Sequence, residues 1–159
     1  MSLINEKIVP RQALKDIVER KKREGKRIVF TNGCFDILHR GHVEYLDFAK
    51  SLGDILIVGV NDDNSVRKLK GSGRPINTLL DRMYVLAALC MTDFITDFHE
   101  STPYNLINEI RPDILVKAGD YTPSGVVGKD IVESYGGKVV IAPYVNGYST
   151  TKIIEKMRK

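Results

Sequence analysis

The segment from Thr31 to His42, TNGCFDILHRGH, holds the side chains best suited to chemistry. His39 and His42 flank Gly41 just after an apolar run typical of a buried strand, where a helix is expected to begin. The first turn of a helix offers free N–H groups and a partial positive charge, which favour phosphate. Two imidazoles there can donate hydrogen bonds to phosphate oxygens and stabilise extra charge at a phosphorus under attack. The pattern therefore predicts a phosphate site, with Gly41 allowing a ligand close to the backbone.

Two other interpretations of this segment remain open. Cys34 and the two histidines supply three of the four ligands that a zinc site needs. No fourth ligand is obvious, and a glycine-rich turn between a strand and a helix suits phosphate better. Asp36 either ligates Mg²⁺ or caps the turn, and we favour the structural role. We therefore expect no metal ion held by the protein's own side chains.

A second group of cations lies on a glycine-rich loop, residues 70–77 (KGSGRPIN). Lys68 and Lys70 are two residues apart, so both would face the same way in an extended chain. Flexible cations such as these, together with Arg74, can clamp a polyphosphate or a phosphorylated substrate. Taken alone, however, the pattern favours an ordinary solvated basic loop.

Three successive hydroxyls, on Ser149, Thr150 and Thr151, open the last expected helix. One of them must cap that helix. The other two, with the free N–H groups of the first turn, can hold a chain of phosphates.

Two further charged residues have open roles. Asp120 lies in the segment 117–121 (KAGDY) after an expected strand, where it can contact a ribose or a base, or only fix a turn. Arg82, on an expected helix, can reach a substrate phosphate or form a surface ion pair.

Strand and helix patterns alternate along the chain. Buried, β-branched runs predict strands at 27–31, 55–60, 93–97, 114–119 and 138–142. Helical spacing and capping residues predict helices near 11–24, 42–51, 62–68, 79–89, 103–110, 127–135 and 149–159. The alternation predicts an α/β fold: a Rossmann-like, doubly wound, mostly parallel five-stranded sheet in a three-layer α/β/α arrangement. Ligands of such sheets bind beyond the carboxyl ends of the strands, so residues just after strands are the functional candidates. They are the segments 31–42, 61–63 (NDD) and 117–121, and the loop before Ser149.

Length and composition are ordinary for a globular protein of one domain: 159 residues, 43% hydrophobic and 28% charged. Disordered and fibrous classes are thereby excluded, and no apolar run reaches the roughly 18 residues that span a bilayer. The N-terminus lacks the pattern of a secretion signal, and two cysteines are too few for a disulfide framework. We expect a single domain over residues 1–159, in the cytoplasm, with no membrane partner.

Positive charge is concentrated at the start of the chain, where residues 1–27 hold 9 basic and 4 acidic side chains. A nucleic-acid site is one interpretation of that excess. The solvated face of an amphipathic helix is the other, and it also explains why Leu14, Ile17 and Val18 recur at helical spacing. We favour the second: residues 1–26 form a basic helical extension packed on the domain, and no nucleic-acid partner is expected.

Two signatures at opposite ends of the chain resemble a known superfamily. TNGCFDILHRGH carries the G-x-F-D-x-x-H-x-G-H signature of the nucleotidyltransferases, and GYSTTKII (147–154) resembles their second signature. Within that superfamily, the segments KLKGSGRPIN, DRMYVLAAL and LVKAGDY are similar to the heptose 1-phosphate adenylyltransferases, including the adenylyltransferase domain of the bifunctional bacterial heptose kinase/adenylyltransferases. The resemblance covers residues 10–159 and leads us to expect the stand-alone version.

The resemblance implies adenylyl transfer from ATP, with Mg²⁺, to D-glycero-D-manno-heptose 1-phosphate. The products would be pyrophosphate and ADP-heptose, which feeds lipopolysaccharide core or surface glycan synthesis, and the protein would be a homodimer. By the same resemblance, His39 and His42 steady the phosphates and the transition state, while Lys70 holds the triphosphate. The expected contacts of the incoming sugar phosphate are Lys68, Arg74 and Arg82. The residues expected to bind the nucleotide are Asn32, Gly33, Cys34, Phe35, Gly41, Asp120, Ser149, Thr150 and Thr151.

Three departures from related patterns bear on the substrate. Tyr144 and Val145 stand where glycerol-phosphate cytidylyltransferases have an Arg-Thr pair, which weakens a cytidylyl assignment. Tyr148 replaces the usual small aliphatic residue.

The alternatives held open are a cytidylyl- or guanylyltransferase acting on another small phosphate such as glycerol phosphate, a nucleotide-binding regulator without turnover, and a nucleic-acid module built on the basic N-terminal helix.

Overall fold

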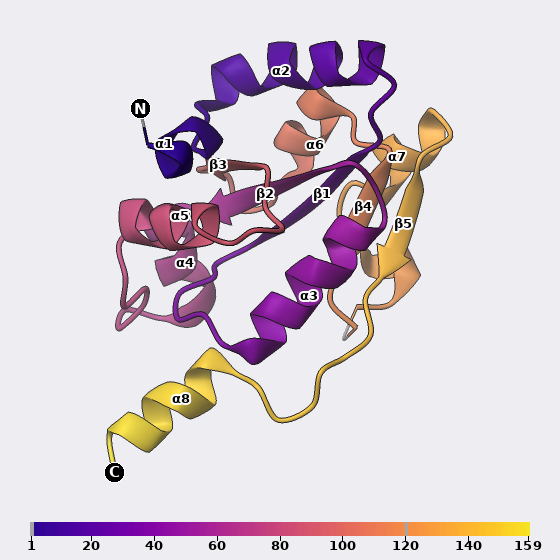
Figure 1. Ribbon diagram of the computed structural model, residues 1–159. Helices are drawn as coiled ribbons and strands as arrows, with labels where there is room; N and C mark the ends of the chain where they lie inside the picture. The colour runs from indigo at the N-terminus through magenta and orange to yellow at the C-terminus, as the bar shows by residue number, and fades with distance from the viewer. Residues whose placement is uncertain (1, 120) are drawn as a thin grey trace.

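A five-stranded parallel sheet lies at the centre of the computed structural model, which describes residues 2–119 and 121–159 (Figure 1). Its strands are β1 (Ile28–Gly33), β2 (Ile55–Asn61), β3 (Phe94–Phe98), β4 (Ile114–Lys117) and β5 (Lys138–Ile141). They lie in the order β3-β2-β1-β4-β5. The order changes direction between β1 and β4, and a crevice is expected beyond the carboxyl ends of these two strands. The predicted doubly wound α/β sheet is confirmed.

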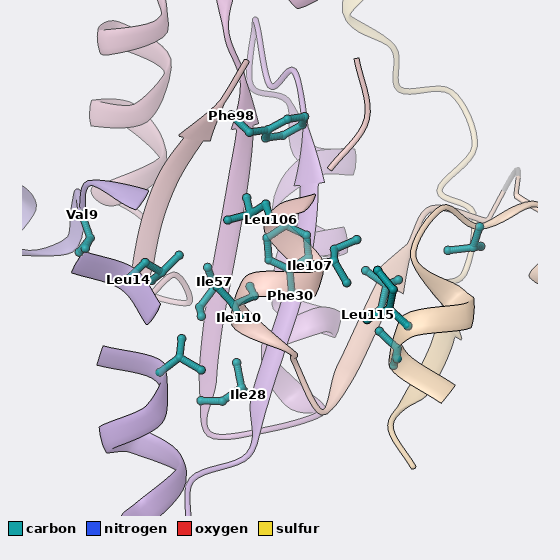
Figure 2. Close-up of a cluster of buried hydrophobic side chains, with 14 residues drawn as sticks. Val9, Leu14, Ile28, Phe30, Ile57, Phe98, Leu106, Ile107, Ile110 and Leu115 are labelled. Carbon is teal, nitrogen blue, oxygen red and sulfur yellow. The ribbon is translucent and has the colours of Figure 1, made fainter. Parts of the chain in front are cut away.

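One face of the sheet is covered by helices from both ends of the chain. Successive side chains of a strand point to opposite faces, and Phe30, Ile57 and Leu115 share this face. Figure 2 shows them gathered with Leu106 and Ile107 of α6 (Tyr104–Ile110). Helices α2 (Arg11–Arg23) and α7 (Lys129–Ser134) complete the cover. Each fully buried side chain of this size contributes about 1.5–3 kcal/mol through removal from water.

The opposite face is covered by α3 (Arg40–Ser51) and α5 (Leu79–Ala87), completing the third layer. Leu46 of α3 and Leu86 of α5 pack there against Leu56 and Val116 of the strands. Both clusters are fully enclosed, so the sheet is buried on its two sides, as its continuous apolar runs predict. The remaining elements are α1 (Leu3–Lys7), α4 (Asp63–Lys70), the 3₁₀ turn η1 (Pro123–Gly125) and α8 (Thr150–Met157).

The structure departs from the sequence expectations mainly at element ends. Helix α4 continues to Lys70, two residues beyond its predicted end, and Gly71 stops it with a φ of 101°. The fourth strand ends at Lys117 rather than Gly119. Helix α1 was not predicted because five residues carry too little periodicity; Ser2 caps it and Ile8 bridges to Ile95 at the edge of β3. Within the described part of the chain, no helix is long and apolar enough to cross a membrane.

The burial of α2 gives a test of how the N-terminal segment contributes to stability. Leu14 of α2 is 0% exposed, whereas Leu3 of α1 is 79% exposed. Leu14→Ala should lower the free energy of unfolding by about 2–5 kcal/mol, because it removes buried methyl groups and leaves a cavity. Leu3→Ala should change it by less than about 0.5 kcal/mol. Urea unfolding measures both; an unchanged midpoint for Leu14→Ala would mean that α2 is a loosely attached arm.

Candidate active site

A pocket of about 720 Å³ opens beyond the carboxyl ends of the strands. It lies where α3 begins and where the connection from β5 to α8 passes beneath the sheet (Figure 1). Most of the residues predicted from the sequence to bind nucleotide or substrate line it. They are Asn32, Gly33, Cys34, Phe35, His39, Gly41, His42, Lys70, Arg74, Ser149, Thr150 and Thr151. Asp120, also predicted, lies outside the described residues.

The two histidines of the first signature stack on each other at the start of α3. Their ring centroids are 3.8 Å apart and their planes differ by 17°. Phe35 meets the His42 ring edge-on, at 5.4 Å between centroids. The Nδ1 atoms of both histidines are buried and have no hydrogen-bond partner among the residues that the structure describes. Packing therefore orients the two rings, because no hydrogen bond from a described residue fixes either Nδ1 atom.

Burial keeps both imidazoles neutral at physiological pH. It lowers the pKa of His39, and it lowers the pKa of His42 to about 4, with a further contribution from the neighbouring His39. A neutral imidazole still donates one N–H bond. A bound polyanion would supply the missing counter-charge and favour the protonated form.

The second signature, at the start of α8, contacts the turn that carries the first signature. Ser149 is the cap of α8, and its Oγ accepts from the Lys152 backbone N at 3.5 Å. Thr150 Oγ1 donates to the Ile37 carbonyl at 3.1 Å, so it ties α8 to the strand–helix turn. Thr151 is exposed at the pocket. Of the three predicted hydroxyls, one caps the helix and one joins the two signatures.

Tyr148 acquires a role that the sequence did not suggest. Its ring lies 6.1 Å from that of His39, with 22° between the planes. A Cβ atom at Gly41 would come within 2.9 Å of the Tyr148 Cβ and 3.1 Å of the His39 ring. Gly41 is therefore needed for this close approach, and Tyr148 covers the histidine pair from the C-terminal segment.

Asp36 fastens the basic loop to the first signature. Its carboxylate is buried and accepts from Arg74 Nε at 2.7 Å and from the backbone N–H groups of Ile76 and Asn77, each at 2.8 Å. Burial opposes ionisation of Asp36, but these donors hold its pKa below the usual range. Asp36 thus has the structural role, and the loop it anchors brings Lys70 and Arg74 to the pocket.

Arg82, predicted either to reach a substrate phosphate or to form an ion pair, is not among the residues that line the pocket. Its guanidinium is buried and donates to the carbonyls of Cys34, at 2.6 Å, and Asn77, at 3.1 Å, and to Asp63 Oδ1, at 2.8 Å. Three acceptors on three segments occupy it, so no substrate phosphate reaches it in this arrangement. Its function here is to hold the backbone that carries the signature.

Lys68 also lies outside the pocket. The prediction treated Lys68 and Lys70 as an extended pair, but both belong to α4, where two positions are about 200° apart around the axis. Lys70 lines the pocket, while Lys68 is exposed elsewhere on the helix. The predicted contact of Lys68 with the incoming phosphate is not supported by this geometry.

Two polar residues of the pocket lie in segments that the sequence marked as candidates, but neither had been given a role of its own. Lys117, the last residue of β4, is 7% exposed, and its ammonium donates to Asn32 Oδ1. Burial lowers its pKa to about 8. Asn61, at the end of β2, is 4% exposed and also lines the pocket. The signal was present in the sequence, because each polar residue follows an apolar strand directly.

The site does not favour zinc. Residues 2–119 and 121–159 contain no group of three or more His, Cys, Asp or Glu side chains arranged to hold a metal ion. Burial raises the pKa of the Cys34 thiol, which disfavours the thiolate that zinc requires. The carboxylate of Asp36 is occupied by its own donors.

Comparison with known proteins identifies the family. Residues 30–156 match the family described as cytidylyltransferase-like. The chain belongs to this family. The predicted membership of the nucleotidyltransferases is thereby confirmed, and this cytidylyltransferase-like chain carries the two signatures of the family on one pocket.

Several curated relatives share more than half of the residues. The chain is 55% identical to the bifunctional protein HldE of Syntrophotalea carbinolica and 55% identical to that of Geobacter metallireducens, each over 151 residues. These matches cover 95% of this chain and 31% of each relative, so the cytidylyltransferase-like chain spans about a third of the length of those proteins.

Two solved structures share the fold. A lipopolysaccharide core biosynthesis protein from Thermoplasma volcanium GSS1 superposes with a TM-score of 0.67 and 29% identity, over 77% of this chain and 100% of the other. A pantoate-beta-alanine ligase from Francisella tularensis, complexed with β,γ-ATP and β-alanine, superposes with a TM-score of 0.62 over 96% of this chain and 79% of the other. At 17% identity, the second likeness concerns the fold alone.

The buried guanidinium gives a stability test. Arg82→Met should lower the free energy of unfolding by about 1–3 kcal/mol, because it leaves buried carbonyls without a donor. Arg82→Lys should not restore it, since one ammonium cannot serve three separated acceptors. Lys68→Met, on the exposed side of α4, should change stability by less than about 0.5 kcal/mol. Urea unfolding compares the variants, and equal midpoints for all would contradict the structural role of Arg82.

The histidine pair gives a titration test. In the free protein, the His42 ring should titrate near pH 4, because its charged form is desolvated. Addition of a non-hydrolysable ATP analogue should raise that pKa, because the triphosphate stabilises the imidazolium. NMR of the ring protons follows both titrations, and His42→Asn assigns the signal. A midpoint near the ordinary value of about 6.5 in the free protein would contradict the buried stack.

Proposed function

We propose that the chain transfers the adenylyl group of ATP to D-glycero-D-manno-heptose 1-phosphate, yielding ADP-heptose and pyrophosphate. The observation that carries the chemistry is the stacked, neutral pair of His39 and His42 at the start of α3, with buried polar atoms that lack partners. The choice of substrate is supported by the 55% identity to HldE proteins and by the likeness to a lipopolysaccharide core biosynthesis protein. The product would serve lipopolysaccharide or surface glycan synthesis.

The proposed reaction needs no protein nucleophile. An oxygen of the sugar phosphate attacks the α-phosphorus of ATP, and the bond from that phosphorus to the oxygen bridging the β-phosphate breaks. The attacking oxygen is already anionic at neutral pH, so no base has to remove a proton. The protein's task is to position the reactants and to stabilise the charge that grows on the α-phosphate. His39, His42 and the free N–H groups of α3 supply donors for that purpose, and Lys70 supplies positive charge.

Mg²⁺ fits this site as a companion of the nucleotide rather than as a resident ion. The carboxylate of Asp36 is occupied by Arg74 and by two backbone N–H groups. The described residues contain no group of three or more His, Cys, Asp or Glu side chains that could hold a metal ion. The triphosphate oxygens would therefore hold Mg²⁺, which would neutralise charge on the departing pyrophosphate. In this proposal the protein binds the phosphates of ATP, and the phosphate oxygens, rather than protein side chains, bind Mg²⁺.

The alternatives have less support. Tyr144 and Val145 line the pocket and place no cation there, which does not favour the cytidylyl assignment. The basic end of α2 is partly engaged within the protein, since Lys21 pairs with Glu24 at 2.9 Å and Lys22 donates to the Arg111 carbonyl. A nucleic-acid site therefore gains no support from α2.

Both cysteines are free, in keeping with the proposed cytoplasmic location. The homodimer is a proposal drawn from the family resemblance.

A panel of nucleotides and acceptors tests the function. Pyrophosphate release should require ATP together with heptose 1-phosphate, supplied as each anomer, and should be much weaker with CTP, GTP or glycerol 3-phosphate. Release with CTP but not with ATP would reject the proposal. Binding of ATP without turnover on any sugar phosphate would favour the regulator instead.

The His42→Asn variant completes this test. It should lower kcat by about 10²–10³-fold, as expected for loss of one donor to the transition state. The circular dichroism and the unfolding midpoint of the variant serve as controls for its fold. An unchanged kcat would remove His42 from the mechanism.

A further inference from the structure

Three polar side chains extend one face of the sheet beyond its apolar core. Asn32, Asn61 and Lys117 lie at the carboxyl ends of β1, β2 and β4. The alternation of strand side chains puts them on the same face as Phe30, Ile57 and Leu115, which is the face covered by α6 and α7 (Figure 2). All three polar residues line the pocket. Ser101 and Thr102, which precede α6, line it as well.

These groups are buried but poorly satisfied. Asn61 as a residue is 4% exposed, and its side-chain amide has no hydrogen bond to any residue that the structure describes. Lys117 is 93% buried, and its ammonium donates to the neutral amide of Asn32 without forming an ion pair to a carboxylate of the described chain. Burying an amide without a partner costs about 1–3 kcal/mol, and burying an unpaired charge costs more. Such groups on a pocket wall are suited to a polar, anionic ligand.

The pocket therefore has two sides. The stacked histidines and the start of α3 belong to the face that α3 and α5 cover, and they are assigned to the triphosphate. Lys117 and Asn61 belong to the opposite face, beside the segment that leads into α6. In the proposed reaction ATP and the sugar 1-phosphate meet between these two sides. Each carries negatively charged phosphate, so the two substrates repel each other there. A cation on the second side would offset their repulsion, and an amide can both donate to and accept from hydroxyls.

We propose that Lys117 and Asn61 form the acceptor compartment: the Lys117 ammonium pairs with the phosphate of the sugar 1-phosphate, and the Asn61 amide binds hydroxyls of the sugar. Asn32 holds the ammonium in place through its Oδ1. The inference rests on the proposed function and specifies which residues recognise its second substrate. It gives Lys117 the contact that the sequence had assigned to Lys68.

Steady-state kinetics with each substrate varied separately tests the compartment. Lys117→Met keeps the length of the side chain and removes its charge; it should raise KM for heptose 1-phosphate about tenfold or more, because a charge-assisted contact is lost. Asn61→Ala should raise the same KM about fivefold. KM for ATP should change less than about twofold in both. Lys138→Met, at the exposed opposite end of β5, is the matched control and should leave both constants unchanged.

The outcomes separate the two proposals. If the wild type releases no pyrophosphate from ATP and heptose 1-phosphate, the proposed function fails and the inference fails with it. If the wild type is active but the variants raise KM for ATP as much as KM for the sugar phosphate, only the acceptor compartment is rejected. Should Lys117→Met be unfolded at the assay temperature, as thermal unfolding would reveal, Asn61→Ala decides the question alone.

Discussion

A buried polar group without a partner is costly, and in this protein that cost is concentrated where substrates are expected to bind. The Nδ1 atoms of the two signature histidines are enclosed and have no partner among the described residues. The ammonium of Lys117, at the carboxyl end of β4, meets the neutral amide of Asn32 and lies 6.0 Å from the Tyr121 ring centroid, but it pairs with no carboxylate of the described chain. The rest of the fold must hold these groups in place, because an unconstrained side chain would turn towards water. The two apolar clusters on either side of the sheet supply that rigidity.

The buried polar residues that support the pocket walls, in contrast, find their hydrogen-bond partners within the protein. Asp36 and Arg82 are as buried as the groups above, yet each side-chain oxygen of Asp36 and each side-chain nitrogen of Arg82 makes at least one hydrogen bond within the protein. Together they connect the turn after β1, the start of α4 and the loop before α5. Asp36 and Arg82, whose partners lie within the protein, thus hold the frame, while Lys117 and the histidine pair line the pocket inside it. This division distinguishes residues that position the site from residues that contact a ligand.

The sequence predicted the sheet, its parallel character and the edge at which the signatures meet. Each of these depends on local patterns, namely the apolar, β-branched runs and their alternation with helical segments. It also brought most of the pocket residues together correctly. Arg82 and Lys68 were predicted to contact the substrate, but neither lines the pocket. A cation in a sequence does not reveal whether its partner is a ligand or another part of the chain. Arg82 finds three internal acceptors, and Lys68 lies on a helix that runs two residues further than its pattern indicated. Lys117 lay in a candidate segment but received no role of its own, because its significance lies in its burial, which only the packed sheet establishes.

The contact between Gly41 and Tyr148 has a consequence for how such chains can diverge. The two residues are more than a hundred positions apart, yet any side chain at 41 would collide with the backbone-proximal part of Tyr148 and with the His39 ring. A substitution at 41 therefore becomes tolerable only if the C-terminal segment retreats, and retreat would uncover the histidines. The first signature and the C-terminal segment are thus constrained to change together, although neither Gly41 nor Tyr148 lies on a strand of the sheet.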